Sequence, residues 1–160
     1  MKGTDAISIL QEQHREVRKL LDELSSTTTR AEKTRARLLP ELETRLRGHM
    51  RIEEEILYPA FREAAENEKE QQMFFEALDE HRAAEMELDE LCKQEVTDVR
   101  FSAKAKVLKD MVEHHVQEEE KCLFPKLREL FTKDELSDLG TKMLERFQAV
   151  AGQHARPAAA

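Results

Sequence analysis

The sequence carries one segment twice, and this repeat constrains the fold more than any other feature of the chain. Residues 49–59 read HMRIEEEILYP and residues 115–125 read HVQEEEKCLFP, so each copy places a His four residues before a Glu and ends in an aromatic–Pro pair. Two residues four apart on an α-helix lie on one face, one turn apart. Each copy therefore offers an imidazole and a carboxylate to one point in space, and two facing copies predict a metal site.

The repeat extends backwards along the chain, because a lone His precedes each copy by nearly the same interval. His14 stands before His49 much as His81 stands before His115, so the chain divides into two halves of one design. Each half contributes one His and then a His-x-x-x-Glu pair. The six candidate metal ligands are His14, His49, Glu53, His81, His115 and Glu119.

The apolar residues follow helical spacing. They recur at alternating steps of three and four positions, which predicts helices rather than strands. Thr29 and Glu32 resemble a capping box, but Pro40 interrupts the helix that this box would open, so that helix either starts near Pro40 or is kinked there. Pro59 and Pro125 predict a kink or a helix end. The other helices are expected at about 5–24, 71–95, 102–130 and 132–150, the last opened by a capping box from Thr132 to Glu135.

The fold class expected from this pattern is all-α, an antiparallel up-down four-helix bundle with an additional C-terminal helix. Charged residues make up 38% of the chain and there is no Trp, which is typical of helical bundles. One domain is expected over residues 1–150, with ligand-bearing helices over about 5–130 and a packing helix over 132–150. The small, polar tail 151–160 is expected to be disordered, and His154 within it to have no role.

Charge and hydropathy exclude two classes of partner. A net charge of −8 argues against nucleic acid, which needs clustered Lys and Arg, and no apolar run approaches the roughly twenty residues that span a bilayer. The polar N-terminus has no signal-peptide pattern. Cys92 and Cys122 lie far apart among apolar neighbours and are interpreted as buried thiols. We therefore expect a soluble, cytoplasmic protein without a nucleic-acid or membrane partner.

The ligand types predict which metal is bound. Imidazole and carboxylate without thiolate favour iron, manganese or zinc, and a His-rich bridged pair favours iron. The pairing of the two halves predicts His14 and His49 on one ion and His81 and His115 on the other. Glu53 and Glu119 are then expected to bridge the ions and to leave coordination positions open for a small reactant.

Helical register decides among neighbouring polar residues. His114 falls off the inward stripe and is assigned to the surface or to the surroundings of the ligands, and four glutamates are expected to point elsewhere. Glu85 follows His81 by four and falls on the inward stripe. Three roles are considered for Glu85: a seventh metal ligand, an acceptor for an imidazole N–H, or the partner of Arg18. The four excluded glutamates are Glu54, Glu55, Glu118 and Glu120.

The aromatic residues before the two prolines are expected to pack in the core at the bundle end. Tyr58 is the only tyrosine and Phe124 is its counterpart in the second copy. If Tyr58 lies near the metals, it is a candidate redox or hydrogen-bonding group.

The paired His-x-x-x-Glu-Glu segments that end in Leu-Tyr-Pro and Leu-Phe-Pro resemble those of the hemerythrin-like, HHE cation-binding domain family. The resemblance covers about Asp5 to Leu130. It implies a four-helix bundle that holds two Fe ions in an oxo- or hydroxo-bridged di-iron centre, with the same six residues as ligands. The oxygen-carrying members have a second His where this chain has Glu85, and they place the last carboxylate five residues after its His rather than four.

These departures argue against reversible oxygen carriage. The function expected is that of a non-haem di-iron protein that binds or reacts with a small oxidant, namely O2, peroxide or NO. Catalase-like disproportionation or peroxidase-like reduction of peroxide are the candidate enzymatic activities. The alternatives are a non-enzymatic iron or oxygen sensor, an iron-handling protein, and a purely structural bundle. The sequence identifies no protein partner and no catalytic residue.

Overall fold

The structure is a computed structural model that describes residues 4–154 of the chain. Every regular element in this range is helical, which confirms the all-α prediction for the described residues. The elements in chain order are α1 (Ala6–Ser25), α2 (Glu32–Ile52), η1 (Glu53–Leu57), α3 (Tyr58–Ala64), α4 (Glu68–Lys93), α5 (Val99–Glu118), η2 (Glu119–Leu123), α6 (Phe124–Leu130) and α7 (Lys133–His154).

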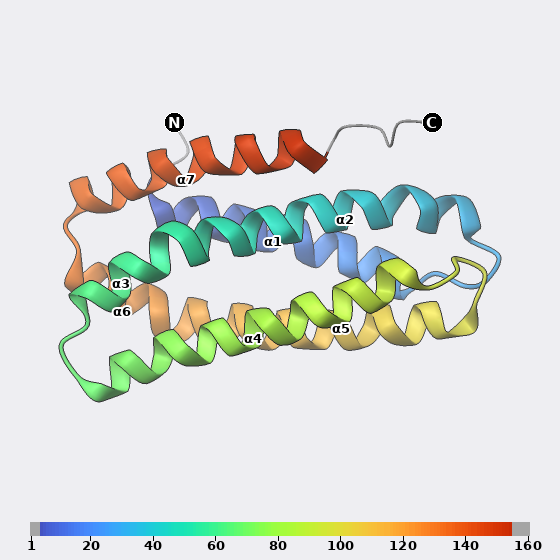
Figure 1. Cartoon of the computed structure of the whole chain (residues 1–160), viewed down its shortest axis with the longest axis horizontal. Coiled ribbons are helices and arrows are strands. Elements are labelled where there is room, and N and C mark those ends of the chain that lie inside the picture. The colour runs from blue at the N-terminus through green and yellow to red at the C-terminus, as the bar shows by residue number, and fades with distance from the viewer. Residues whose placement is uncertain (1–3, 155–160) are drawn as a thin grey trace.

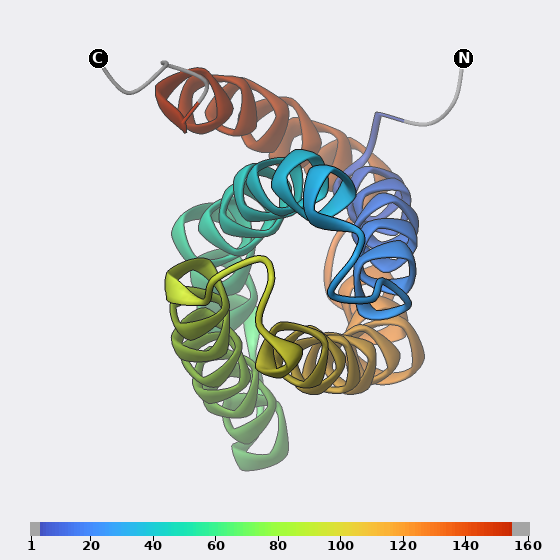
Figure 2. The ribbon, with the colours of Figure 1, turned by 90° about the vertical axis from the view of Figure 1, so that its right-hand side faces the viewer.

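Four long helices surround a common axis. Contacts join α1 to α2 and to α5, and α4 to α5 and to α2, so each of these helices packs against two others. The end-on view shows the resulting ring, with α7 outside it against α1 and α2 (Figure 2). In the side view, the α1–α2 and α4–α5 connections meet at one end, and α3 and α6 lie at the other (Figure 1). Inward side chains from all four helices can therefore meet on one axis.

The core is divided into two apolar clusters. One lies toward the α1–α2 and α4–α5 connections and includes Leu21, Leu42, Leu88 and Leu108. The other lies toward α3 and α6 and includes Ile7, Ile52, Phe61 and Phe124. Along α1, α2 and α4 the predicted His stands between residues of the two clusters, and after His115 of α5 the second cluster resumes at Leu123 of η2. The buried polar residues therefore form a layer between two apolar clusters.

A π-helical turn precedes each of the two prolines at which a kink or a helix end is predicted. The Tyr58 N–H donates to the Glu53 carbonyl, and the Phe124 N–H donates to the Glu119 carbonyl, five residues back in both cases. The next residue is a proline, which has no N–H to continue the α-helical ladder. A wide turn thus carries the chain into α3 and α6. It begins at Glu53 in the first half and at Glu119 in the second, which is why the two glutamates sit at equivalent places.

Several predicted boundaries change. The capping box at Thr29 is wrong: α2 begins at Glu32, its N-cap Ala31 makes no side-chain capping bond, and the helix continues through Pro40. The second box is confirmed, because the Thr132 N–H donates to Glu135 Oε2 at 2.7 Å and the Glu135 N–H to Thr132 Oγ1 at 3.3 Å.

The C-terminal helix is longer than predicted. α7 runs to His154, so residues 151–154 of the expected tail are helical. The rest of that tail, 155–160, lies outside the described residues. The thiols also differ from expectation, since Cys92 is only partly buried and Cys122 is exposed. None of the helices in the described part of the chain has both the length and the hydropathy needed to cross a bilayer.

Candidate metal centre

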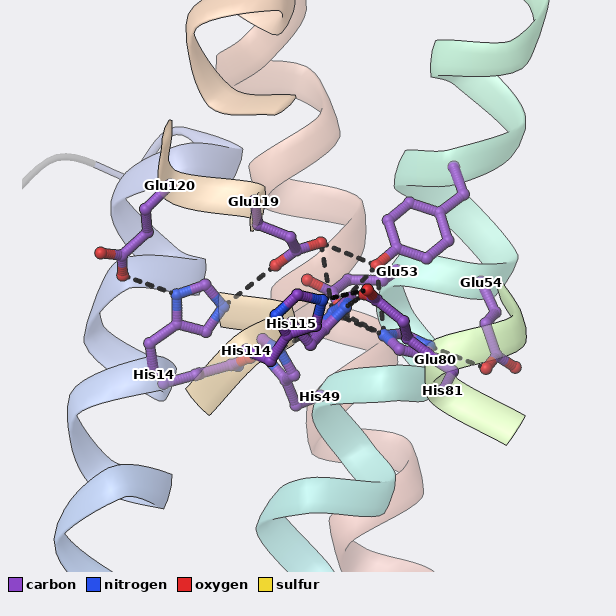
Figure 3. A network of polar contacts seen from close by, with 12 residues as sticks. His14, His49, Glu53, Glu54, Glu80, His81, His114, His115, Glu119 and Glu120 are labelled. Atoms are coloured by element: carbon purple, nitrogen blue, oxygen red, sulfur yellow. Dashed lines mark hydrogen bonds and ion pairs between the residues drawn. The ribbon is translucent and has the colours of Figure 1, made fainter. Parts of the chain in front are cut away.

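The structure brings the six predicted residues together in one buried layer, each of them with at most 7% of its surface exposed. They come from all four long helices and the two π-turns, and their side chains point toward one another (Figure 3). The ring centroids of His14 and His49 lie 4.9 Å apart, and those of His81 and His115 lie 4.6 Å apart. The imidazoles thus form two pairs, the same pairs that the repeat predicts.

The two carboxylates lie between these imidazole pairs. Glu53 Oε2 is 3.3 Å from His49 Nε2 and 3.2 Å from His81 Nε2, so one oxygen faces both pairs. Glu119 spans them instead, with Oε2 3.1 Å from His14 Nε2 and Oε1 3.6 Å from His115 Nε2. Each carboxylate therefore lies close to imidazoles of both pairs.

Two sets of donor atoms meet the geometric requirement for a cation. One set comes from His14, His49, Glu53 and Glu119, and in it one ligand atom from each residue lies within 4.8 Å of the others. The second set, from Glu53, His81 and His115, meets the same limit. Glu53 belongs to both sets, as expected of a residue shared by two ions.

Each of the four histidines of the site is oriented by a hydrogen bond from its Nδ1 to a side chain on a neighbouring helical element. The Nδ1–H of His14 donates to Glu120 at 2.8 Å, and that of His81 donates to Glu54 at 2.9 Å. In all four imidazoles Nδ1 is engaged in this way, which leaves the lone pair of Nε2 directed at the centre. The other two bonds run from His49 Nδ1 to Gln13 Oε1 (2.8 Å) and from His115 Nδ1 to Glu80 Oε2 (2.6 Å).

These four acceptors were not found by the sequence analysis. Glu54 and Glu120 were assigned away from the site, although they bind imidazole N–H groups there. The repeat contains the signal that finds them: Gln13 and Glu80 each precede the lone His of their half, and Glu54 and Glu120 each follow the glutamate of the His-x-x-x-Glu pair. Their hydrogen bonds join α1 to α2, α4 to α5, and each π-turn to the next helix around the ring.

Tyr58 lies within the polar layer rather than at the bundle end. Its O–H donates to Glu119 Oε1 at 2.7 Å, and its oxygen is 3.1 Å from His81 Nε2. Phe124, its counterpart in the repeat, instead stacks on the His14 ring at 5.7 Å with an interplanar angle of 4°. The hydrogen-bonding role left open for Tyr58 therefore agrees with the structure, and the packing role agrees for Phe124.

Glu85 does not contribute to this layer. It is an exposed residue whose carboxylate lies 3.3 Å from Arg47, and Arg18 pairs with Glu113 instead, so all three roles considered for Glu85 are wrong. The inward stripe of α4 passes from His81 through Ala84 to Leu88, because the step after the histidine is three rather than four residues. His114 lies on the surface, as the register predicted.

In the metal-free layer, burial disfavours the charged forms of two of the six residues. Burial, together with the nearby Glu119 carboxylate, raises the pKa of Glu53 well above its ordinary value. Burial, together with the charge of His14, lowers the pKa of His49 well below its ordinary value. Three buried polar atoms, His49 Nε2 and both carboxylate oxygens of Glu53, have no hydrogen-bond partner among the described residues.

A bound metal ion would satisfy these groups. Buried polar atoms without partners cost free energy, about 1–3 kcal/mol each in proteins. A cation would accept the lone pairs of Nε2 and of the carboxylates together, and it would offset the repulsion between Glu53 and Glu119. The donor set of imidazole and carboxylate suits iron, manganese or zinc.

Comparison with known proteins relates the chain to a cation-binding domain. The family model described as Hemerythrin HHE cation binding domain matches residues 5–127. Among solved structures, the chain is similar to a hemerythrin HHE cation binding domain-containing protein from Mycobacterium kansasii, with a TM-score of 0.79 and 29% sequence identity over 93% of this chain and 88% of that one. No curated protein matches the chain significantly.

Proposed function

The chain belongs to the hemerythrin HHE cation-binding domain family, and from this premise we propose that it is a non-haem di-iron protein that reacts with a small oxidant. In this proposal the bundle of α1, α2, α4 and α5 holds the ions, and α7 is a packing helix outside it. His14 and His49 bind one ion, His81 and His115 bind the other, and Glu53 and Glu119 bridge them. The single observation that carries the proposal is the set of four inward Nε2 lone pairs around two buried carboxylates.

The space around the site supports a small reactant. A cavity of about 40 Å³ between α4 and η2 is lined by exposed Cys122 and by buried His115 and Glu119. A water molecule needs about 10–15 Å³ of such space, so this cavity has room for a molecule of the size of O2, peroxide or NO beside His115 and Glu119. A second, apolar cavity of about 10 Å³ lies against the four histidines among Val17, Leu46 and Val112.

The chain's own residues would hold protons and exclude water around the ions. When bound, the iron pair supplies electrons and open coordination positions to the reactant. The Tyr58 hydroxyl oxygen lies 2.7 Å from Glu119 Oε1, and burial raises the pKa of Tyr58 well above the ordinary tyrosine value, so this hydroxyl stays protonated at neutral pH. It can donate a hydrogen bond within the layer. The apolar clusters on both sides keep bulk water out.

The proposal is tested by iron analysis, absorption spectroscopy and peroxide consumption on protein purified from iron-replete cells. We expect about two irons per chain, an absorption spectrum typical of bridged ferric pairs, and evolution of oxygen from peroxide. Two bound irons without any reaction toward peroxide, O2 or NO would reject the reactivity. Protein without iron after reconstitution would reject the metal site itself.

Replacing Tyr58 by Phe is expected to slow peroxide consumption about tenfold without changing the iron content. Loss of one hydrogen bond, about 1–1.5 kcal/mol, corresponds to a factor of roughly ten in rate. Phe124 already fills the equivalent place in the other half, so the ring itself fits. The measurement is the rate per bound iron pair. An unchanged rate at equal iron content would remove Tyr58 from the reaction.

Iron binding is expected to weaken on acidification from about pH 8 to about pH 6, because protons and iron compete for Nε2. Although burial opposes it, contact with Glu119 raises the pKa of both His14 and His115 in the metal-free protein. A raised pKa means that protons are held up to a higher pH, so the loss of affinity should begin above the ordinary histidine value of 6.5. Competition with a chelator at each pH measures this, and a constant affinity across the range would contradict it.

A further inference from the structure

The two halves of the site differ in one of their N–H acceptors. In the second half both imidazoles donate to carboxylates, His81 to Glu54 and His115 to Glu80. In the first half the corresponding bonds go to Glu120 from His14 and to the amide oxygen of Gln13 from His49. Gln13 and Glu80 hold the same position in the repeat, one residue before the lone His, so the difference is a substitution of amide for carboxylate within one design.

The carboxylate of the first half is also shared with a cation. Arg18 Nη1 lies 3.8 Å from the Glu120 oxygen that accepts from His14. In the repeat, Arg18 corresponds to Glu85, which is exposed and paired with Arg47. Glu80 has a second contact too, but it is to His114, 3.2 Å away on the surface. The first half therefore has one neutral acceptor and one acceptor that an arginine partly neutralises.

The group that accepts a hydrogen bond from the Nδ1–H of an imidazole changes how strongly the Nε2 of that imidazole binds a metal. A carboxylate on Nδ1–H draws the proton toward itself, which increases the electron density at Nε2 and strengthens the metal bond. A neutral amide oxygen orients the ring in the same way but makes a bond about half as strong as a charge-assisted one. Replacing such acceptors in metal sites typically changes affinity by 10–100-fold. Glu53 belongs to both donor sets, whereas Glu119 joins only the set of His14 and His49, so the order of loading tests the acceptors against the number of donors.

We propose that Gln13 makes the His14–His49 position the weaker of the two, so that iron loads in order. The ion between His81 and His115 binds first, and the ion between His14 and His49 binds second and leaves first. Gln13 and Glu80 are the positioning residues that set this order. The inference rests on the proposed function, since it requires that two ions bind.

The test is an anaerobic titration of the metal-free protein with Fe(II) against a competing chelator, which resolves two binding steps. Gln13→Glu is expected to tighten the weaker step about tenfold, and Glu80→Gln to weaken the tighter step about tenfold. Both variants keep an oxygen acceptor for Nδ1–H, so a purely structural role would leave the two steps unchanged. Gln11→Glu and Glu76→Gln make the same charge changes on the same helices and are expected to leave both steps unchanged.

Two variants that each lack one metal ligand test which of the two ions binds first. His14→Ala is expected to keep the tight step and lose the weak one, whereas His81→Ala is expected to lose the tight step. The reverse result, or shifts in Gln13→Glu and Glu80→Gln no larger than in their controls, would overturn the inference while leaving a two-iron site intact. A wild-type protein that binds fewer than two irons would instead reject the proposed function.

Discussion

Replacing Glu53 by Gln is expected to reduce the iron content from two ions per chain to at most one. Glu53 is fully buried, and one of its oxygens lies within 3.3 Å of an imidazole from each pair. A carboxylate can bridge two cations through its charge and two oxygens, whereas the amide of Gln is neutral and offers only one oxygen. The loss should be seen directly by elemental analysis of the purified variant.

The same substitution should have opposite effects on the stabilities of the loaded and empty proteins. Without metal, the Glu53 carboxylate is buried without a hydrogen-bond partner, and its pKa is raised, so the folded state disfavours its charge. A carboxyl group whose pKa is raised on folding stabilises the folded state at pH values below its pKa in the unfolded chain, near 4.5. This contribution is lost as the pH rises. At neutral pH we therefore expect metal-free Glu53→Gln to be about 1–3 kcal/mol more stable than the metal-free parent.

With iron present the ranking should reverse, because the parent gains the binding free energy of two ions. An ion at a hundred times its dissociation constant stabilises the folded state by about 2.7 kcal/mol. Glu55→Gln is the matched control, since Glu55 lies two residues further along the π-turn and pairs with Arg146 of α7 at 2.6 Å. It should keep two irons. Two irons in Glu53→Gln would contradict the bridging assignment, whatever the melting temperatures show.

Replacing Arg35 by Met is expected to destabilise the protein by about 3 kcal/mol without changing the iron content. Arg35 is fully buried, and its side chain contacts Thr27 in the α1–α2 connection and Val96 in the α4–α5 connection. Its guanidinium donates to Thr27 Oγ1 at 2.8 Å, to the Val96 carbonyl at 2.6 Å and to Ser102 Oγ at 2.5 Å, and it lies 4.6 Å from the centre of the Phe101 ring. Methionine fills similar space but leaves these buried oxygens without a donor, at about 1–3 kcal/mol each before relaxation.

Thermal unfolding checks this prediction. For a chain of this size, each kcal/mol corresponds to about 2–4 °C, so the melting temperature should fall by roughly 6–12 °C. Arg37→Met is the control on the same helix, because Arg37 is 62% exposed and its ion pair with Glu23 is on the surface. A surface change of this kind stays within about 0.5 kcal/mol. Equal melting temperatures for the two variants would show that the Arg35 contacts contribute nothing to stability.

The sequence was most informative where helical spacing alone fixes which residues share a face. On a helix, His49 and Glu53 share a face whatever the rest of the chain does, and the same holds for His115 and Glu119. The repeat then indicated which lone His belongs to each half. This is why the six residues could be identified together without any knowledge of the bundle.

Errors arose where the position of a side chain depends on a second helix or on the local winding. Glu85 fell on the stripe when counted in steps of four, but α4 turns Ala84 inward and leaves Glu85 exposed. Glu54 and Glu120 were excluded by ideal α-helical register, although the chain there is π-helical. A wide turn changes the direction of every side chain within it, so α-helical spacing does not predict which residues point inward there.

By itself, the sequence determined that the chain is helical, that its halves share one design, and which imidazoles and carboxylates belong to the buried layer. These properties follow from periodicity within a helix, which is local. Only the tertiary structure decided which acceptor orients each Nδ1–H, that Tyr58 reaches Glu119, and that Arg35 joins two connections. Each of these contacts joins residues at least eight positions apart, so it depends on how the helices are placed around their common axis.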